Sequence, residues 1–178
     1  MSTVESPHRF ETMRLFVVMG VAGCGKSSIG AAVAGRLGAT YLDGDDFHPA
    51  SNIEKMSRGE ALTDDDRWPW LQIVGRETAR RKGKVLTGCS ALRRAYRDYL
   101  VAAAAEPVGF IFLDGSRELI AERMARRQGH FMPLSLLDSQ FATLERPAGD
   151  EPALTVDISG SEANVVQQIC SHFEADRR

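Results

Sequence analysis

Four ionisable side chains stand close together in the segment 41–56, which reads YLDGDDFHPASNIEKM. They follow a short apolar run and are Asp43, Asp45, Asp46 and His48. Acidic clusters of this kind form solvated turns, bind metal ions, or accept hydrogen bonds from a substrate rich in hydroxyl groups. The choice between these roles depends on the glycine-rich segment that lies upstream.

The upstream segment, GVAGCGKSS, begins at Gly20 and matches the pattern G-x-x-x-x-G-K-[ST]. Its glycines allow successive backbone N–H groups to turn inward around phosphate oxygens, in conformations that a Cβ atom would obstruct. The helix expected after it points its positive N-terminal end at the same anion. We therefore predict an ATP-binding loop that consists of Gly20, Val21, Ala22, Gly23, Cys24, Gly25, Lys26, Ser27 and Ser28.

Two side chains of this loop are expected to take part in the chemistry directly. Lys26 is predicted to reach the β- and γ-phosphates of ATP, and the hydroxyl group of Ser27 is predicted to ligate Mg²⁺. The small side chain of Cys24 is expected to point away from the phosphates. The alternative is a glycine-rich turn that binds nothing, and the strand–loop–helix context argues against it.

The acidic segment follows the predicted strand 40–42, so it is expected at the carboxyl edge of the sheet, beside the phosphate loop. We predict that Asp43 faces Mg²⁺ through a water molecule, and that Asp45 orients or deprotonates the attacking substrate hydroxyl. Asp46 is expected to be an exposed turn carboxylate. His48 is predicted to donate to a substrate hydroxyl or carboxylate, the alternative being a local hydrogen bond in the turn.

The elements that position these residues alternate between short apolar runs and longer amphipathic stretches. Nearly continuous apolar runs indicate strands that are buried on both faces of a parallel sheet. The alternation predicts an α/β protein with a three-layer α/β/α P-loop NTPase fold, a mainly parallel five-stranded sheet and a helical lid at about 129–147. The predicted strands are 15–19, 40–42, 85–87, 110–113 and 154–158, and the predicted helices are 26–37, 50–58, 67–82, 91–104, 117–127 and 162–173.

Length and composition exclude several classes of protein. The 178 residues contain no repeat or linker, which predicts a single domain over 14–178 after a loose N-terminal extension, 1–13. A net charge of −2 argues against a nucleic-acid partner. No apolar run approaches the ~20 residues of a membrane span, and no signal peptide is recognisable. Three widely spaced cysteines fit a reducing compartment, so we expect a cytoplasmic protein.

Phosphate loops occur in GTPases, in motor ATPases and in small-molecule kinases, so the loop alone does not define the reaction. The guanine-binding motif N-K-x-D is absent, and the chain is too short for a large remodelling ATPase. The segment FIFLD superficially resembles a Walker B strand, but we favour capping of the next helix by Asp114 or Ser116. These features favour a compact small-molecule kinase.

Four segments together resemble the gluconokinases, a family of P-loop kinases. The resemblance covers residues 17–169 and implies ATP- and Mg²⁺-dependent phosphorylation of D-gluconate at its 6-hydroxyl, by a protein that is often a homodimer. Ala22 and Cys24 replace serines that are frequent in the family's loop, but these positions contribute backbone N–H groups. The four segments are GVAGCGKSS, DGDDFHPASNIEKMSRGEALTDDDRWPWL, CSALRRAYRDYL and RRQGHFMPLSLLDSQFATLERP.

Gluconate carries one carboxylate, so its site needs a strong cation. By the resemblance, Arg67 and Arg97 belong to the substrate-side motifs, where a guanidinium can bind a carboxylate bidentately. The alternative for each arginine is an ion pair on the surface. The acidic run 64–66 is expected to cap the helix that carries Trp68 and Trp70, and these tryptophans are expected to pack rather than to stack on a ligand.

Arg123 and Arg127 are expected on one face of a helix that leads into the lid. By similarity to related kinases, Arg123 lies near the adenine and Arg127 reaches the phosphates, where a cation stabilises the transition state. Arg126 is expected to face solvent, and His130 to contact substrate or phosphate. Two alternatives stay open: a kinase of another small hydroxy-acid such as shikimate, and a non-catalytic nucleotide-binding regulator.

Overall fold

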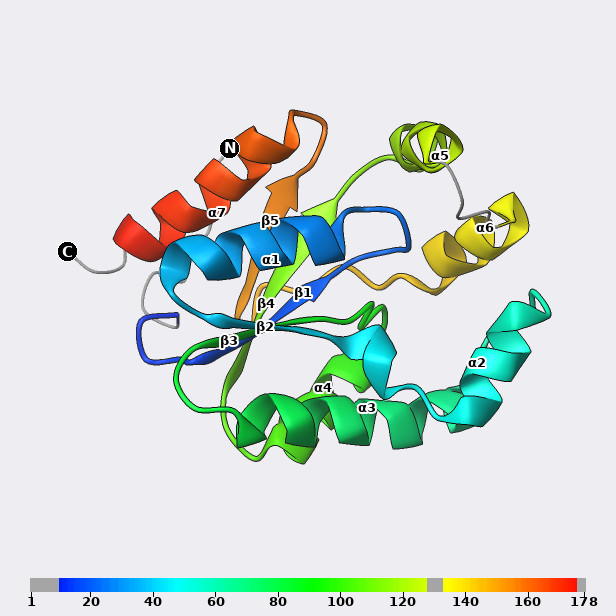
Figure 1. Cartoon of the computed structure of the whole chain (residues 1–178), viewed down its shortest axis with the longest axis horizontal. Coiled ribbons are helices and arrows are strands. Elements are labelled where there is room, and N and C mark those ends of the chain that lie inside the picture. Colours follow the sequence, from blue (N-terminus) through cyan, green and yellow to red (C-terminus); the bar gives the residue numbers. More distant parts are fainter. Residues whose placement is uncertain (1–9, 128–132, 176–178) are drawn as a thin grey trace.

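A parallel five-stranded sheet forms the middle layer of the protein in a computed structural model that describes residues 10–127 and 133–175 (Figure 1). The strand order is β2-β3-β1-β4-β5, and every neighbouring pair is parallel. The predicted α/β class is confirmed, and each predicted strand lies within two residues of the observed one. The strands are β1 (Leu15–Met19), β2 (Thr40–Asp43), β3 (Val85–Gly88), β4 (Val108–Asp114) and β5 (Ala153–Asp157).

Helices cover both faces of this sheet. On one face lie α1 (Lys26–Leu37) and α7 (Glu162–Ala175), and on the other lie α3 (Asp64–Arg80) and α4 (Arg94–Ala104) (Figure 1). The shorter elements gather at the end of the sheet where the strands finish. They are the 3₁₀ helix η1 (Gly44–Phe47), α2 (Ala50–Ser57), α5 (Arg117–Arg126) and α6 (Leu134–Thr143).

The central strand β1 is buried along its whole length and divides the core into two halves. Phe16 and Val18 pack with residues of α1 and α7, whereas Leu15, Val17 and Met19 pack with residues of α3 and α4. This follows from the two-residue period of a strand, whose successive side chains point to opposite faces. The phosphate loop therefore starts from a strand that is buried along its whole length.

Two predicted helix starts are wrong, and each has a local cause. Helix α3 begins at Asp64, not at residue 67, because Thr63 and Asp66 form a reciprocal capping box. Helix α4 begins at Arg94, not at residue 91, because Ala91 has a φ angle of 44°. A left-handed residue with a Cβ atom cannot continue a right-handed helix.

Part of the predicted loose extension belongs to the core. Phe10 is 7% exposed, and its ring stacks on Phe173 of α7 with a centroid distance of 5.9 Å and meets Phe16 edge-on at 5.2 Å. The prediction of a loose segment is therefore wrong for Phe10, while residues 1–9 lie outside the described part of the chain. Within the described residues, no helix has the length and apolar character that crossing a membrane requires.

Candidate active site

The predicted phosphate loop, residues 20–28, runs from the end of β1 into the first turn of α1. Gly20, Gly23 and Gly25 have φ angles of 146°, 80° and 99°, which are backbone conformations that favour glycine. Helix α1 starts at Lys26, directly after the last of these glycines. The Lys26 Nζ atom donates to the carbonyl oxygens of Gly20 and Val21, each at 3.0 Å. The loop thus has the form that a phosphate cradle requires.

A cavity of about 410 Å³ opens beside this loop. Its walls come from the phosphate loop, η1, the α2–α3 connection, α3, the segment after β3, and α6. Elements that are far apart in the sequence therefore share one pocket at the carboxyl ends of the strands, as expected for this class of sheet. The predicted site residues that it brings together are Ala22, Gly23, Gly25, Lys26, Ser27, Asp45, His48, Arg67 and Arg127.

A second cavity, of about 310 Å³, lies on the other side of the loop. Gly23, Gly25 and Arg127 line both cavities, so the loop and one arginine stand between them. Arg123 lines the second cavity and donates to the carbonyl oxygens of Ile158 and Gly160 at 2.5 and 3.1 Å. The two cavities are separate spaces that meet at the phosphate loop.

Two local predictions about α5, the helix before the lid, are confirmed. Arg126 is exposed and pairs with Glu122, so it faces solvent as predicted. Ser116 caps α5 by accepting a hydrogen bond from the N–H group of Leu119 at 3.1 Å. Asp114 instead accepts from Arg146 at 2.6 Å. Of the two capping candidates, Ser116 is the residue that caps.

Ser27 and Asp43 lie side by side at the edge of the first cavity. The Ser27 hydroxyl donates to Asp43 Oδ2 at 3.2 Å, and Asp43 Oδ1 accepts from the N–H group of Asp45 at 3.0 Å. A hydroxyl and a carboxylate next to a phosphate loop are the oxygen ligands that Mg²⁺ prefers. The donor set therefore fits the predicted metal position. The described residues contain no group of three or more His, Cys, Asp or Glu side chains that could hold a metal ion on their own.

The position of Asp45 at the start of η1 depends on the close approach of two backbone segments, at Gly44 and Gly88. A Cβ atom on the preceding Gly44 would lie 2.3 Å from the carbonyl oxygen of Gly88, so only glycine fits there without a shift. The Gly44 carbonyl also accepts a hydrogen bond from the buried indole of Trp70 at 2.8 Å. The predicted packing role of Trp70 is confirmed, and this packing fixes where Asp45 stands.

His48 faces Asp45 and has a defined orientation. Its ring stacks on Trp70 with centroids 4.1 Å apart, and its Nε2 atom lies 3.7 Å from Asp45 Oδ1. Asn52 Nδ2 lies 3.3 Å from His48 Nδ1, so the ring has a polar neighbour at each nitrogen. The His48 ring holds the pKa of Asp45 below its ordinary 3.8, and Lys26 contributes in the same direction.

Arg67 lines the first cavity, as predicted for a substrate residue. Its Nη1 atom donates to the hydroxyl group of Tyr96 at 3.2 Å, and its guanidinium lies over the Tyr96 ring at 5.2 Å. Asp64 Oδ1 lies 3.7 Å from the same nitrogen. These contacts leave a cation at the cavity wall in a fixed position, which suits the binding of a carboxylate.

Arg97 does not line either cavity, so the prediction that it binds substrate is not supported. Its side chain is 1% exposed and forms a two-pronged ion pair with Glu151, at 2.6 and 3.0 Å. A third bond runs from Nη1 to the carbonyl oxygen of Ala91 at 2.9 Å. Arg97 thus joins α4 to the segment before β5. The predicted contact of His130 falls outside the described residues.

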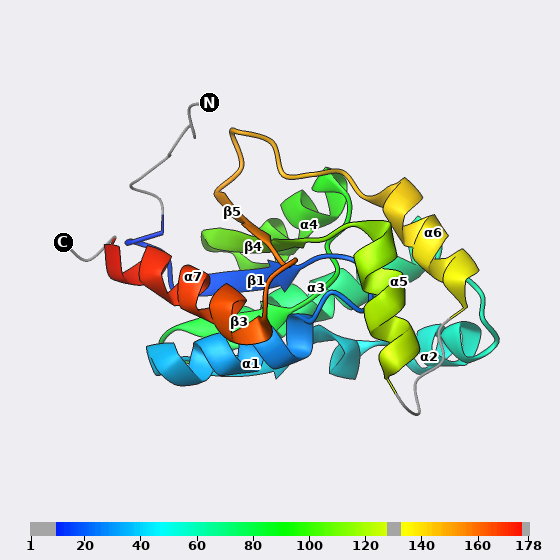
Figure 2. The ribbon, with the colours of Figure 1, turned by 90° about the horizontal axis from the view of Figure 1, so that it is seen from above.

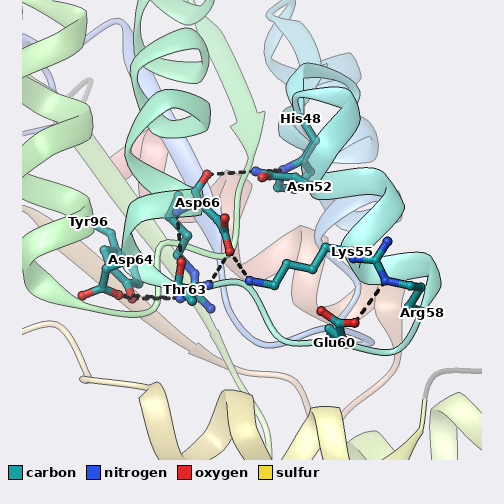
Figure 3. A network of polar contacts seen from close by, with 10 residues as sticks. His48, Asn52, Lys55, Arg58, Glu60, Thr63, Asp64, Asp66 and Tyr96 are labelled. Carbon is teal, nitrogen blue, oxygen red and sulfur yellow. Dashed lines mark hydrogen bonds and ion pairs between the residues drawn. The ribbon is translucent and has the colours of Figure 1, made fainter.

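A polar network joins α2 to the start of α3 and contacts His48 through Asn52 (Figure 3). Asn52 Nδ2 also donates to the carbonyl oxygen of Asp66 at 2.9 Å, and Lys55 Nζ lies 2.7 Å from Asp66 Oδ2. The Lys55 ammonium, followed by the N–H and hydroxyl groups of Thr63, lowers the pKa of Asp66 to about 2. The sequence alone did not reveal this network, although Thr63 and Asp66 carry the capping-box spacing.

This lowered pKa predicts a pH-dependent contribution to stability. Because the Asp66 pKa is lower in the folded state, its stabilising effect is complete above about pH 4 and disappears as the pH falls toward about 2. We expect the melting temperature of Asp66→Asn to fall less steeply across this window than that of the wild type. Thermal unfolding followed by circular dichroism measures both slopes. The matched control is Asp65→Asn, at the neighbouring exposed position, and an equal change in slope for both variants would contradict the assignment.

Comparisons with known proteins agree with this geometry. The family model described as an AAA domain matches residues 15–147. The thermosensitive gluconokinase of Escherichia coli is 48% identical over 86% of this chain and 83% of its own length. The gluconokinase of Gluconobacter oxydans is 44% identical, with 92% and 93% covered. A solved gluconokinase structure from Sinorhizobium meliloti superposes with a TM-score of 0.84 at 46% identity, covering 90% of this chain and 91% of that one.

The similarity spans the features that define the site, since the family match and both relatives extend over most of the chain. The phosphate loop, Asp45 after β2 and Arg127 at the start of the lid all line one cavity. Sequence identity, fold and site geometry therefore agree, and the chain belongs to the gluconokinase family of P-loop kinases.

Proposed function

We propose that the protein transfers the γ-phosphoryl group of ATP to the 6-hydroxyl of D-gluconate. The observation that carries this proposal is the arrangement of Lys26, Asp45 and Arg127 around one cavity beside the phosphate loop. A non-catalytic regulator would not need a carboxylate poised at an acceptor pocket. Membership of the gluconokinase family supports gluconate, rather than another small hydroxy-acid, as the acceptor.

Asp45 orients the attacking hydroxyl and receives its proton. Because the pKa of Asp45 is held below 3.8, the carboxylate is ionised at neutral pH and is a weak base. It therefore takes the proton only as the new oxygen–phosphorus bond forms and the hydroxyl becomes acidic. The bond between the γ-phosphorus and the bridging oxygen of ADP breaks in the same in-line displacement, with no covalent enzyme intermediate. His48 keeps Asp45 ionised and in place.

The phosphate groups are bound by the loop and by two cations. The backbone N–H groups of the loop other than that of Ala22, which donates to Gln140, surround the phosphate oxygens together with the positive end of α1. Lys26 exchanges its carbonyl partners for the β- and γ-phosphates. Arg127 lines both cavities and is placed to stabilise charge on the transferring group. Mg²⁺, held by Ser27 and through water by Asp43, would neutralise phosphate charge.

The carboxylate of gluconate is bound at the far wall of the first cavity by Arg67. This guanidinium is already oriented by Tyr96 and Asp64, so little rotamer freedom is lost when the substrate binds. Arg123 is proposed to lie against the adenine in the second cavity. The acceptor and the nucleotide therefore approach the loop from opposite sides.

The test is a coupled assay of ADP release with ATP and Mg²⁺. D-gluconate is compared with shikimate, glucose and other aldonates, and the phosphorylated product is identified by NMR. Turnover with gluconate well above that with the other acceptors supports the proposal. Selective turnover with shikimate or another acid would assign a different acceptor, and ATP binding without turnover on any acceptor would indicate a regulator.

Replacement of Lys26 by alanine is expected to lower kcat by about 100-fold, because one charge-assisted donor to the transferring phosphate is lost. The assay above measures this loss. Lys82→Ala is the matched control, because Lys82 is exposed in the turn after α3 and lines neither cavity. Equal kcat values for the two variants would remove Lys26 from the phosphate site.

We further propose a cytoplasmic location and a homodimeric state. The three cysteines are buried and unpaired, which supports a reducing compartment. The dimer rests on the family resemblance alone. Light scattering of the purified chain measures its mass in solution directly.

A further inference from the structure

Gln140, in the lid helix α6, contacts the phosphate loop directly. Its Oε1 atom accepts a hydrogen bond from the backbone N–H group of Ala22 at 2.7 Å, across 118 positions of sequence. Gln140 also lines the first cavity, beside residues of the acceptor site. None of the roles described above uses this side chain.

One face of α6 is turned into the cavity. Leu136, Ser139, Gln140 and Thr143 all line it, and their spacing of three, four and seven residues places them on the same side of a helix. Three of these four side chains are polar. A polar helix face inside an acceptor pocket offers hydrogen bonds to a substrate that is rich in hydroxyl groups.

The rest of α6 is fixed by contacts on its other sides. Leu137 is fully buried in the core, and Asp138 forms an ion pair with Arg117 of the neighbouring α5 (Figure 2). The Gln140 side chain is itself half-buried. The helix face in the cavity is therefore preorganised, and its side chains lose little freedom when a ligand binds.

The contact with Ala22 also fixes the orientation of the Gln140 amide. A backbone N–H group only donates, so the atom opposite it must be the amide oxygen. The NH₂ group consequently points away from the loop, and it carries two donors and no acceptor. Such a group can bind a hydroxyl or carboxylate oxygen but cannot accept from a hydroxyl group.

We propose that Gln140 is a specificity-determining residue, whose NH₂ group donates to an oxygen of the acceptor while its Oε1 atom stays bound to the Ala22 N–H group. This rests on the proposed function. Ser139 and Thr143 complete the polar wall on the same helix face. The acceptor is thereby held by a side chain that is hydrogen-bonded to the phosphate loop. This contact positions the acceptor hydroxyl next to the phosphoryl group that is transferred.

Two substitutions separate this role from that of a simple tether between α6 and the loop. Gln140→Leu removes both the acceptor and the donors, whereas Gln140→Glu keeps an oxygen for the Ala22 N–H group, removes the donors and adds a negative charge. Ser135→Ala is the matched control, because Ser135 is exposed on the same helix and does not line the cavity. For each variant, KM for gluconate, KM for ATP and kcat are measured with the full chain.

Donation to the acceptor predicts that both Gln140 variants raise KM for gluconate about tenfold, with KM for ATP within about twofold of the wild type. A near-normal KM for gluconate in Gln140→Glu, with a raised value in Gln140→Leu, would show a tether and overturn the proposal. Equal increases in both KM values would also overturn it, because the effect would then lie on the phosphate loop. Absence of gluconate turnover in the wild type would instead refute the proposed function itself.

Discussion

Asp45→Asn is expected to lower kcat for gluconate phosphorylation by about 1,000-fold, with KM for ATP nearly unchanged. Asparagine has almost the same shape, so its side-chain oxygen can still accept from His48, which lies 3.7 Å from Asp45. An amide cannot receive the proton of the attacking hydroxyl, however, and it lacks the negative charge that orients this group. The loss therefore falls on the chemical step and not on nucleotide binding.

The matched control for this substitution is Asp46→Asn. Asp46 is the next residue of η1 and is exposed, but it does not line the cavity. We expect its kcat to stay within about twofold of the wild type, in line with the small effects of surface substitutions. Steady-state kinetics at saturating ATP, with circular dichroism as a check on folding, measures both variants. Near-normal turnover in Asp45→Asn would remove Asp45 from the catalytic step.

Arg97→Met is expected to destabilise the protein by about 3–5 kcal/mol, because it leaves the buried Glu151 carboxylate without its cation. Arg97 is 1% exposed and makes all three of its described hydrogen bonds to Glu151 and Ala91. Met has a similar length and fills much of the same space. The free energy of unfolding, measured in urea, therefore reports mainly the unpaired charge.

The pH dependence of this deficit provides a second check. Burial raises the pKa of Glu151, but Arg97 and the N–H group of Ala148 outweigh it and hold the pKa below its ordinary 4.5. In the wild type this stabilisation is present above pH 4.5 and disappears as the pH falls through the folded pKa. Without Arg97, the effect of burial on the pKa of Glu151 dominates, and this carboxyl group takes up a proton more readily. The difference in free energy of unfolding between the wild type and Arg97→Met should therefore decrease as the pH is lowered.

A double variant, Arg97→Met with Glu151→Gln, distinguishes the loss of a charge partner from the loss of packing. The neutral glutamine can still accept from the Ala148 N–H group, which bonds Glu151 Oε1 at 3.0 Å in the wild type. We expect the double variant to be more stable than Arg97→Met alone. If the two variants are equally unstable, lost packing of Arg97 accounts for the effect.

The local parts of the site were accessible from the sequence. The phosphate loop, its lysine and its serine follow from glycine spacing and from the apolar run before Gly20, since both are encoded within a few residues. The position of Asp45 follows from the end of β2, because parallel strands bring their carboxyl ends together. The five strands were likewise predicted to within two residues, since buried parallel strands are nearly continuous in apolar residues.

The long-range parts were not accessible. Arg97 stands in a segment that resembles a substrate-side motif of the family. Only its partner Glu151, 54 residues away, shows that it is structural. The contact between Gln140 and Ala22 joins segments that no local pattern connects. A single aromatic residue carries no periodicity, so no local pattern places Phe10 in the core, and its place there depends on α7. Such pairings are properties of the fold and not of any short segment.

The position of β2 at the edge of the sheet has a consequence for how acceptor preference can evolve. The phosphate loop leaves from β1, which has a strand on each side, whereas Asp43 and the turn that carries Asp45 leave from an outermost strand with one neighbour. Mutations in that outer segment disturb fewer packed neighbours, so selection can remodel the acceptor pocket while the inherited phosphate machinery stays intact. A library aimed at new sugar acids is best concentrated in α2 and the inner face of α6, because Gly44 and Asp45 of η1 cannot be varied without loss of packing or of the chemistry.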